Sequence, residues 1–64
     1  MQGTEIIRDR YGMRIGEIRV NGSRQVLHDR YGYILGSYDS HDDFTRDKYG
    51  TVVGRGNSLV TLLK

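Results

Sequence analysis

The fold of this protein is decided by a motif that occurs three times: RDRYGMRIG at residues 8–16, HDRYGYILG at residues 28–36 and RDKYGTVVG at residues 46–54. The copies begin 20 and 18 residues apart. Recurrence at a nearly fixed period is typical of a repeat architecture in which each copy forms one supersecondary unit. We therefore expect a single domain over residues 1–64, with repeats at about 5–23, 24–42 and 43–57 and an apolar tail at 58–64.

Each motif predicts a β-hairpin. Asp is favoured at the first position of a type I turn and Gly at the fourth, and a type I turn followed by a left-handed Gly closes a hairpin with a bulge. The carboxylate of such an Asp accepts N–H groups of its own turn, so it needs no chemical role. The residues that open the turns are Asp9, Asp29 and Asp47, and those that close them are Gly12, Gly32 and Gly50.

The second glycine of each motif predicts a cross-strand partner. Counting back from the first turn places Ile6 opposite Gly16. The equivalent pairs in the other copies are Val26 with Gly36 and Phe44 with Gly54. A bulky side chain that covers a cross-strand glycine is a common device of β-sheets.

The apolar pattern also slips by one residue near this glycine. Ile15 is followed by Ile18, a step of three where a strand has a period of two. One inserted residue restores the alternation. We therefore expect a β-bulge or a sharp bend at the second glycine of each motif, Gly16, Gly36 and Gly54, and a sheet that curls.

Outside the motifs, the chain has two connections and a tail. Asn21-Gly22 predicts a type I′ hairpin turn, which would set Arg19 opposite Arg24, and residues 39–43 form a polar loop. The expected strands are about 4–9, 13–20, 24–29, 33–38, 43–47 and 51–55.

The fold class is therefore an all-β antiparallel meander of about six strands, as a curled sheet or a small barrel. In the tail, Leu59, Leu62 and Leu63 share a helical face behind a capping Asn57 or Ser58. This favours one or two helical turns, and a seventh strand is the alternative.

Composition limits how so small a domain is stabilised. A chain of 64 residues has a small core, and domains of this size often rely on disulfides, metals or partner subunits. The absence of Cys excludes disulfides and thiolate zinc sites. Apolar residues are expected on both faces of the strands, so we predict a homo-oligomer, most simply a symmetric dimer.

The net charge of +2 comes from cations and acids that alternate along the chain. Such mixing is ordinary for a soluble surface, whereas nucleic-acid binders more often show clustered cations. No apolar run is long enough to cross a membrane, and residues 1–10 lack the apolar stretch of a signal peptide. We expect a cytoplasmic protein without a membrane partner.

The candidate binding residues lie on the hairpins. A tyrosine beside a cation at each tip could stack bases or sugars, but the favoured reading is a turn residue that packs over the neighbouring strand or glycine. These residues are Tyr11, Tyr31 and Tyr49 with Arg10, Arg30 and Lys48. Arg14, expected opposite Arg8, could contact phosphate or RNA, with solvation or an ion pair as the favoured reading.

The chain has no pattern of catalysis or metal binding. There is no G-x-S-x-G motif, no phosphate-binding loop and no dinucleotide fingerprint. His41 lies among Asp39, Asp42 and Asp43, but the spacing does not match an EF-hand loop. We therefore expect no enzyme activity, no cofactor and no metal.

The D-x-x-G-x-x-x-G core of the motifs resembles small bacterial β-hairpin repeat proteins. These include the YD repeats of RHS-type proteins and the β-flower proteins of unknown function. The resemblance covers residues 5–56 and implies an all-β hairpin-repeat fold without catalytic residues. The function expected is a non-enzymatic, homo-oligomeric module for protein binding or structural assembly. The alternative is a module that binds RNA or single-stranded DNA through arginines and tyrosines of the hairpin turns.

Overall fold

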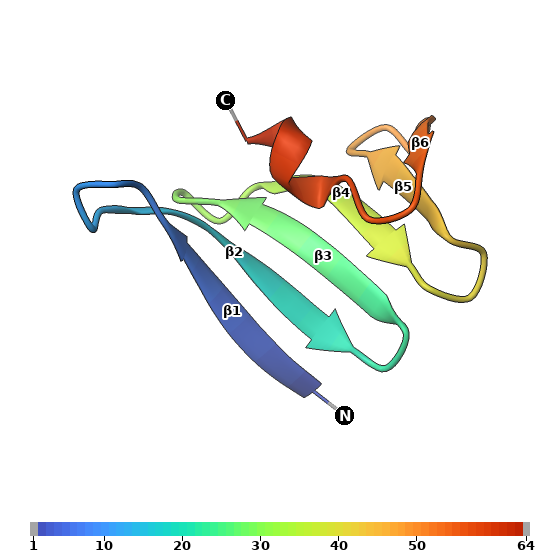
Figure 1. Ribbon diagram of the computed structural model, residues 1–64, viewed down its shortest axis with the longest axis horizontal. Helices are drawn as coiled ribbons and strands as arrows, with labels where there is room; N and C mark the ends of the chain where they lie inside the picture. Colours follow the sequence, from blue (N-terminus) through green and yellow to red (C-terminus); the bar gives the residue numbers. More distant parts are fainter. Residues whose placement is uncertain (1, 64) are drawn as a thin grey trace.

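Six antiparallel strands pair in the order in which they follow along the chain, so the sheet is a meander (Figure 1). The computed structural model describes residues 2–63. The strands are β1 (Gln2–Arg8), β2 (Arg14–Asn21), β3 (Arg24–Asp29), β4 (Ile34–Asp39), β5 (Phe44–Asp47) and β6 (Val52–Arg55). A single 3-10 turn, η1 (Leu59–Leu62), follows them. The predicted all-β meander is confirmed.

The sheet is open, so the alternative of a small barrel is wrong. Within residues 2–63, β1 pairs only with β2 and β6 only with β5. Closure would require the two edges to join along their length, yet β6 has 4 residues and β1 has 7. The helical segment η1 is too short to cross a membrane.

The three hairpin tips have the predicted geometry. Gly12, Gly32 and Gly50 have φ angles of 81°, 90° and 85°, a left-handed conformation that favours glycine. In the second tip, Oδ1 of Asp29 accepts the backbone N–H groups of Tyr31 at 2.8 Å and Tyr33 at 2.9 Å. The same two hydrogen bonds occur at Asp9 and Asp47, so each motif builds its own turn.

The bulges lie one residue earlier than predicted. Ile7 pairs with Gly16 and Arg8 with Arg14, which leaves Ile15 as the extra residue. The extra residues of the other copies are Leu35 and Val53. The predicted partners of the second glycines are therefore wrong by one position, because the shift occurs before the glycine. The residues that face Gly16, Gly36 and Gly54 are Ile7, Leu27 and Thr45.

The connection between β2 and β3 also differs from the prediction. Asn21 pairs with Arg24, so the two loop residues are Gly22 and Ser23, and Arg19 faces Val26 instead of Arg24. Gly22 has a φ of 63° at the first loop position, and no other residue of this loop has a positive φ. This is the arrangement of a type II′ turn, in which glycine comes first.

The C-terminal tail is helical, as favoured, and covers one face of the sheet beside β4 (Figure 1). Leu59 is fully buried and forms the core with Ile18 and Leu27. The approach to η1 is held by the buried Thr45, whose hydroxyl donates to the carbonyl of Gly56 at 2.7 Å and accepts the N–H of Ser58 at 2.9 Å.

The second glycines provide the space in which this tail packs. A Cβ atom on Gly36 would overlap the carbonyl oxygen of Arg46 and the side chain of Leu62. On Gly16 it would lie 2.8 Å from the carbonyl oxygen of His28 and 3.1 Å from Leu63. The absent side chains therefore admit two leucines of the tail, a role that the hairpin motif alone did not reveal.

Candidate functional site

The six candidate residues at the hairpin tips form three equivalent cation–aromatic pairs. The cationic groups of Arg10, Arg30 and Lys48 lie 5.1, 5.2 and 5.3 Å from the ring centres of Tyr11, Tyr31 and Tyr49. The tyrosines are between 73% and 80% exposed, so they do not pack on the sheet. Alternate turns of a meander share one end of the sheet, so neighbouring tips are two strands, or about 9.5 Å, apart.

Arg14 belongs to a different group, centred on Glu17 in β2. The carboxylate of Glu17 accepts hydrogen bonds from Arg14 and, at 2.9 Å, from Nε of Arg19. The hydrogen bond from Arg19 is the main reason why the pKa of Glu17 is lowered. Arg14 does pair with Arg8 across the first hairpin, and Glu17 offsets the repulsion between these like charges.

Glu17 is only 8% exposed although η1 packs on the opposite face of the sheet. It pairs with His28 of β3, which is equally buried and whose ring Nδ1 lies 3.2 Å from the carbonyl oxygen of Gly32. His28 thus has a structural contact in the second hairpin. Arg8 makes the equivalent contact in the first hairpin, where its guanidinium donates to the carbonyl of Gly12 at 3.2 Å.

The sheet separates its charges between its two faces. Directly paired residues of an antiparallel sheet share a face and successive residues alternate, so the register assigns each strand residue to one face. The face opposite η1, here called the uncovered face, carries Arg8, Arg14, Arg19, Arg24, Arg46 and Arg55 with the acids Glu17 and Asp39. The face under η1 carries the acids Glu5, Asp29 and Asp47 and no cation of the described strands.

Sequence reasoning found only part of this cationic face. It placed Arg8 opposite Arg14 but did not include Arg46 or Arg55, and the predicted register was wrong by one residue beyond the third bulge, at Arg55. A one-residue shift moves a side chain to the other face of a sheet. Once the bulge is placed at the residue before the second glycine, counting in steps of two along each strand puts these arginines on one face.

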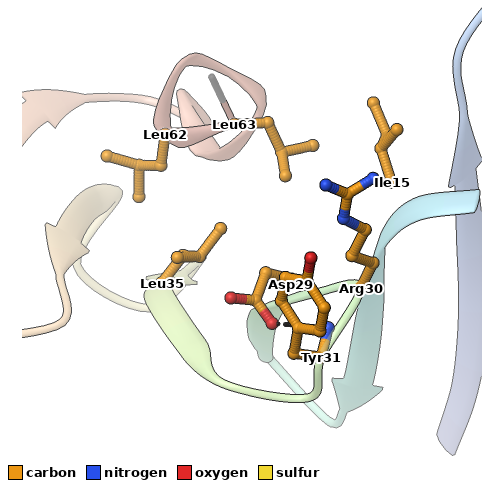
Figure 2. Close-up of a pocket in the computed structure, with 7 residues that line it drawn as sticks. All are labelled: Ile15, Asp29, Arg30, Tyr31, Leu35, Leu62 and Leu63. Carbon is orange, nitrogen blue, oxygen red and sulfur yellow. Dashed lines mark hydrogen bonds between the residues drawn. The ribbon is translucent and has the colours of Figure 1, made fainter.

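A pocket of about 460 Å³ lies under η1 (Figure 2). Its apolar walls come from the bulge residues Ile15 and Leu35 and from Leu62 and Leu63 of the tail. Figure 2 shows these leucines facing Leu35, with Arg30 beside Ile15 at the polar side. The remaining lining residues are Asp29, Arg30 and Tyr31. The volume suits a small molecule, and the lining offers an apolar contact with a polar rim and no Ser, Cys or His nucleophile.

The acidic residues of the polar loop after β4 make hydrogen bonds and an ion pair within the protein. Asp39 accepts the N–H of His41, and Asp42 forms an ion pair with Arg46 at 2.9 Å. Asp43 accepts the hydroxyl of Tyr38 at 2.8 Å, and this hydrogen bond raises the pKa of Tyr38. Within residues 2–63, no three His, Cys, Asp or Glu side chains are grouped so that they could hold a metal ion.

Comparison with protein-family models, with curated proteins and with solved structures gave no match for this chain. The resemblance to YD repeats and to β-flower proteins therefore stays a prediction, and function is argued from the surfaces described above.

Proposed function

We propose that the protein is a non-enzymatic β module that assembles with copies of itself through the edge of β1. This strand carries the proposal because it is the longer and less protected edge of the open sheet. Another protein that offers a free strand is a second partner of the same kind.

Incomplete burial within one chain supports assembly. The accessible surface is 4740 Å², whereas a compact monomer of this mass exposes about 4,200 Å². Only Ile18, Leu27 and Leu59 are buried apolar residues among those described. A partner subunit would cover part of the remaining apolar surface.

The two edges of the sheet differ in how they are protected. Natural edge strands are blunted by short length, by Lys or by Pro. Neither edge strand contains Lys or Pro, and each ends at an arginine. They differ in length: β6 has only 4 residues, whereas β1 has 7 and has no neighbour on its outer side among residues 2–63. Antiparallel pairing of β1 with the β1 of a second copy closes a symmetric dimer.

Two lysines on β1 are expected to convert this dimer to a monomer. Thr4 and Ile6 are exposed and lie on the same face of the strand. In a β1 pairing centred on residue 4, 5 or 6, the substitutions T4K and I6K place lysine opposite lysine, and like charges in direct opposition are destabilising. Size-exclusion chromatography with light scattering measures the mass, and circular dichroism checks the fold.

The matched control is H41K, which adds a lysine to an exposed loop far from β1 in the sequence. The control should keep the mass of the unmodified protein. A monomeric unmodified protein at micromolar concentration contradicts assembly, and a dimer that survives T4K/I6K contradicts the β1 edge as its interface.

The hairpin tips favour a second function, the binding of single-stranded nucleic acid. Three exposed tyrosines, each beside a cation and all at one end of the sheet, present a row of stacking platforms. Bases stack on aromatic side chains with little dependence on sequence, and neighbouring cations attract the phosphates.

Removal of these three rings is expected to weaken binding of a fluorescent oligothymidylate by at least tenfold. Each stacked base contributes about 1–3 kcal/mol by alanine substitution, and Y11A/Y31A/Y49A removes all three platforms. A salt titration by fluorescence anisotropy measures the affinity. The control is Y33A, because Tyr33 is equally exposed and has no cation over its ring among residues 2–63. Equal losses in the two variants, or no binding at low salt, contradict this function.

A further inference from the structure

We propose that single-stranded nucleic acid lies across the uncovered face of the sheet, with its phosphates on the strand arginines and one end at the hairpin tips. This inference rests on the second proposed function and identifies the surface that performs most of the binding. Within the part of the chain described, η1 is the one element outside the sheet, and it packs on the opposite face.

The charge of the uncovered face calls for an anionic partner. Its strands carry six arginines and two acids, although the whole chain has a net charge of only +2. Because acids lie on the opposite face, the net charge of the whole chain does not reveal the cationic face. A second copy stacked face to face would bring the arginines of both copies together, which costs free energy.

Apolar side chains between the arginines favour a single strand over a duplex. Ile6, Ile34 and Val52 are exposed on this face, and the guanidinium of Arg46 lies 6.0 Å from the ring centre of Phe44. A duplex presents mainly phosphates, whereas a single strand also presents base faces to apolar and aromatic groups. Arginine suits both contacts because its planar group pairs with phosphate and stacks on rings.

Five of the six arginines fall into two groups, and the sixth, Arg8, donates to the backbone carbonyl of Gly12 at 3.2 Å. Ion pairs orient three of them, since Arg14 and Arg19 contact Glu17 and Arg46 contacts Asp42. Arg24 and Arg55 have no carboxylate within ion-pair distance among the described residues. The second group is therefore available to phosphate, and its removal leaves the ion pairs of the sheet intact.

The β1 dimer would extend this surface. In a continuous antiparallel sheet, paired residues share a face, so the uncovered faces of two copies joined at β1 lie on the same side. Assembly and nucleic-acid binding therefore use different parts of the molecule and are compatible.

The test compares two variants with the same change in charge. R24Q/R55Q removes two arginines from the uncovered face. V60E/T61E adds two acids on η1, where both residues are exposed on the opposite side of the sheet. The probe is a fluorescent oligothymidylate of about ten nucleotides, because the longest dimension of the protein is 34 Å and a stacked nucleotide rises about 3.4 Å.

We expect R24Q/R55Q to bind at least tenfold more weakly at low salt, and to lower the slope of log affinity against log salt by about 1.4 for two lost phosphate contacts. V60E/T61E should stay within about twofold of the unmodified protein at about 0.15 M salt, because a Debye length of about 8 Å screens acids on the far side of a molecule 18 Å thick. Circular dichroism confirms that both variants are folded.

The remaining outcomes distinguish nucleic-acid binding as such from binding on the uncovered face. If R24Q/R55Q keeps its affinity while Y11A/Y31A/Y49A loses it, nucleic-acid binding stands and the uncovered face is not its surface. If both charge variants lose affinity equally, the effect is one of total charge and the inference fails. If the unmodified protein binds vesicles of phosphatidylserine but no oligonucleotide, both the inference and the second function are overturned.

Discussion

Replacing Gly36 with alanine is expected to lower the free energy of unfolding by about 3 kcal/mol, the upper part of the range for overpacking a filled site. The new methyl group would overlap the carbonyl oxygen of Arg46, which belongs to the backbone of the neighbouring strand, and the side chain of Leu62. Leu62 can move, but a backbone carbonyl in a sheet can move only if the strands separate. The free energy of unfolding of a domain of 64 residues is roughly 3–10 kcal/mol. This one methyl group is therefore expected to remove much of the stability.

Gly54→Ala is the matched control, because Gly54 occupies the same motif position in the third copy. Its nearest neighbour would be Oγ of Ser58 at 3.5 Å, an ordinary contact, and its φ is not positive. We expect stability unchanged or raised by about 0.5 kcal/mol, since alanine restricts the unfolded chain. Thermal unfolding at one protein concentration measures both, with a fall of roughly 12–24 °C for G36A at 4–8 °C per kcal/mol. Similar melting temperatures for the two variants would contradict the role assigned to Gly36.

Leu59→Ala is expected to cost about 3 kcal/mol, as is typical for truncating a fully buried leucine. Leu59 is 0% exposed and is the one fully buried residue that η1 contributes to the core of Ile18 and Leu27. Its removal leaves a cavity under a single helical turn, and the turn has no other fully buried side chain among the described residues. Chemical denaturation at fixed protein concentration measures the loss.

Val60→Ala tests whether burial or helical propensity accounts for that loss. Val60 is the next residue of the same turn and is 62% exposed. We expect a change within about 0.5 kcal/mol, as for most surface substitutions. If L59A and V60A are equally stable, the tail does not contribute to the core.

The hairpins could be predicted because their causes are local. An aspartate that accepts the N–H groups of its own turn and a glycine that takes a positive φ act within five residues. These interactions need no partner elsewhere in the chain, so residues 9–13 specify the first tip wherever the rest of the chain lies. Three such tips in series already imply an antiparallel meander.

The candidate site could be predicted only where it coincides with a tip. The cation–tyrosine pairs join neighbouring residues, so the motif itself places them together. The cationic face draws on five strands, and its composition depends on the register of every pair. An error of one residue at each bulge was enough to hide it.

By itself, the sequence determined the number of hairpins, the geometry of their turns and the all-β meander, since each follows from contacts between residues close in the chain. The tertiary structure decided the position of the bulges, the open sheet and the role of Gly16 and Gly36. These depend on Leu62 and Leu63, which reach the glycines from the far end of the chain. Packing between distant segments selects one register among several that the turns allow, and that register sorts the arginines and the acids onto opposite faces.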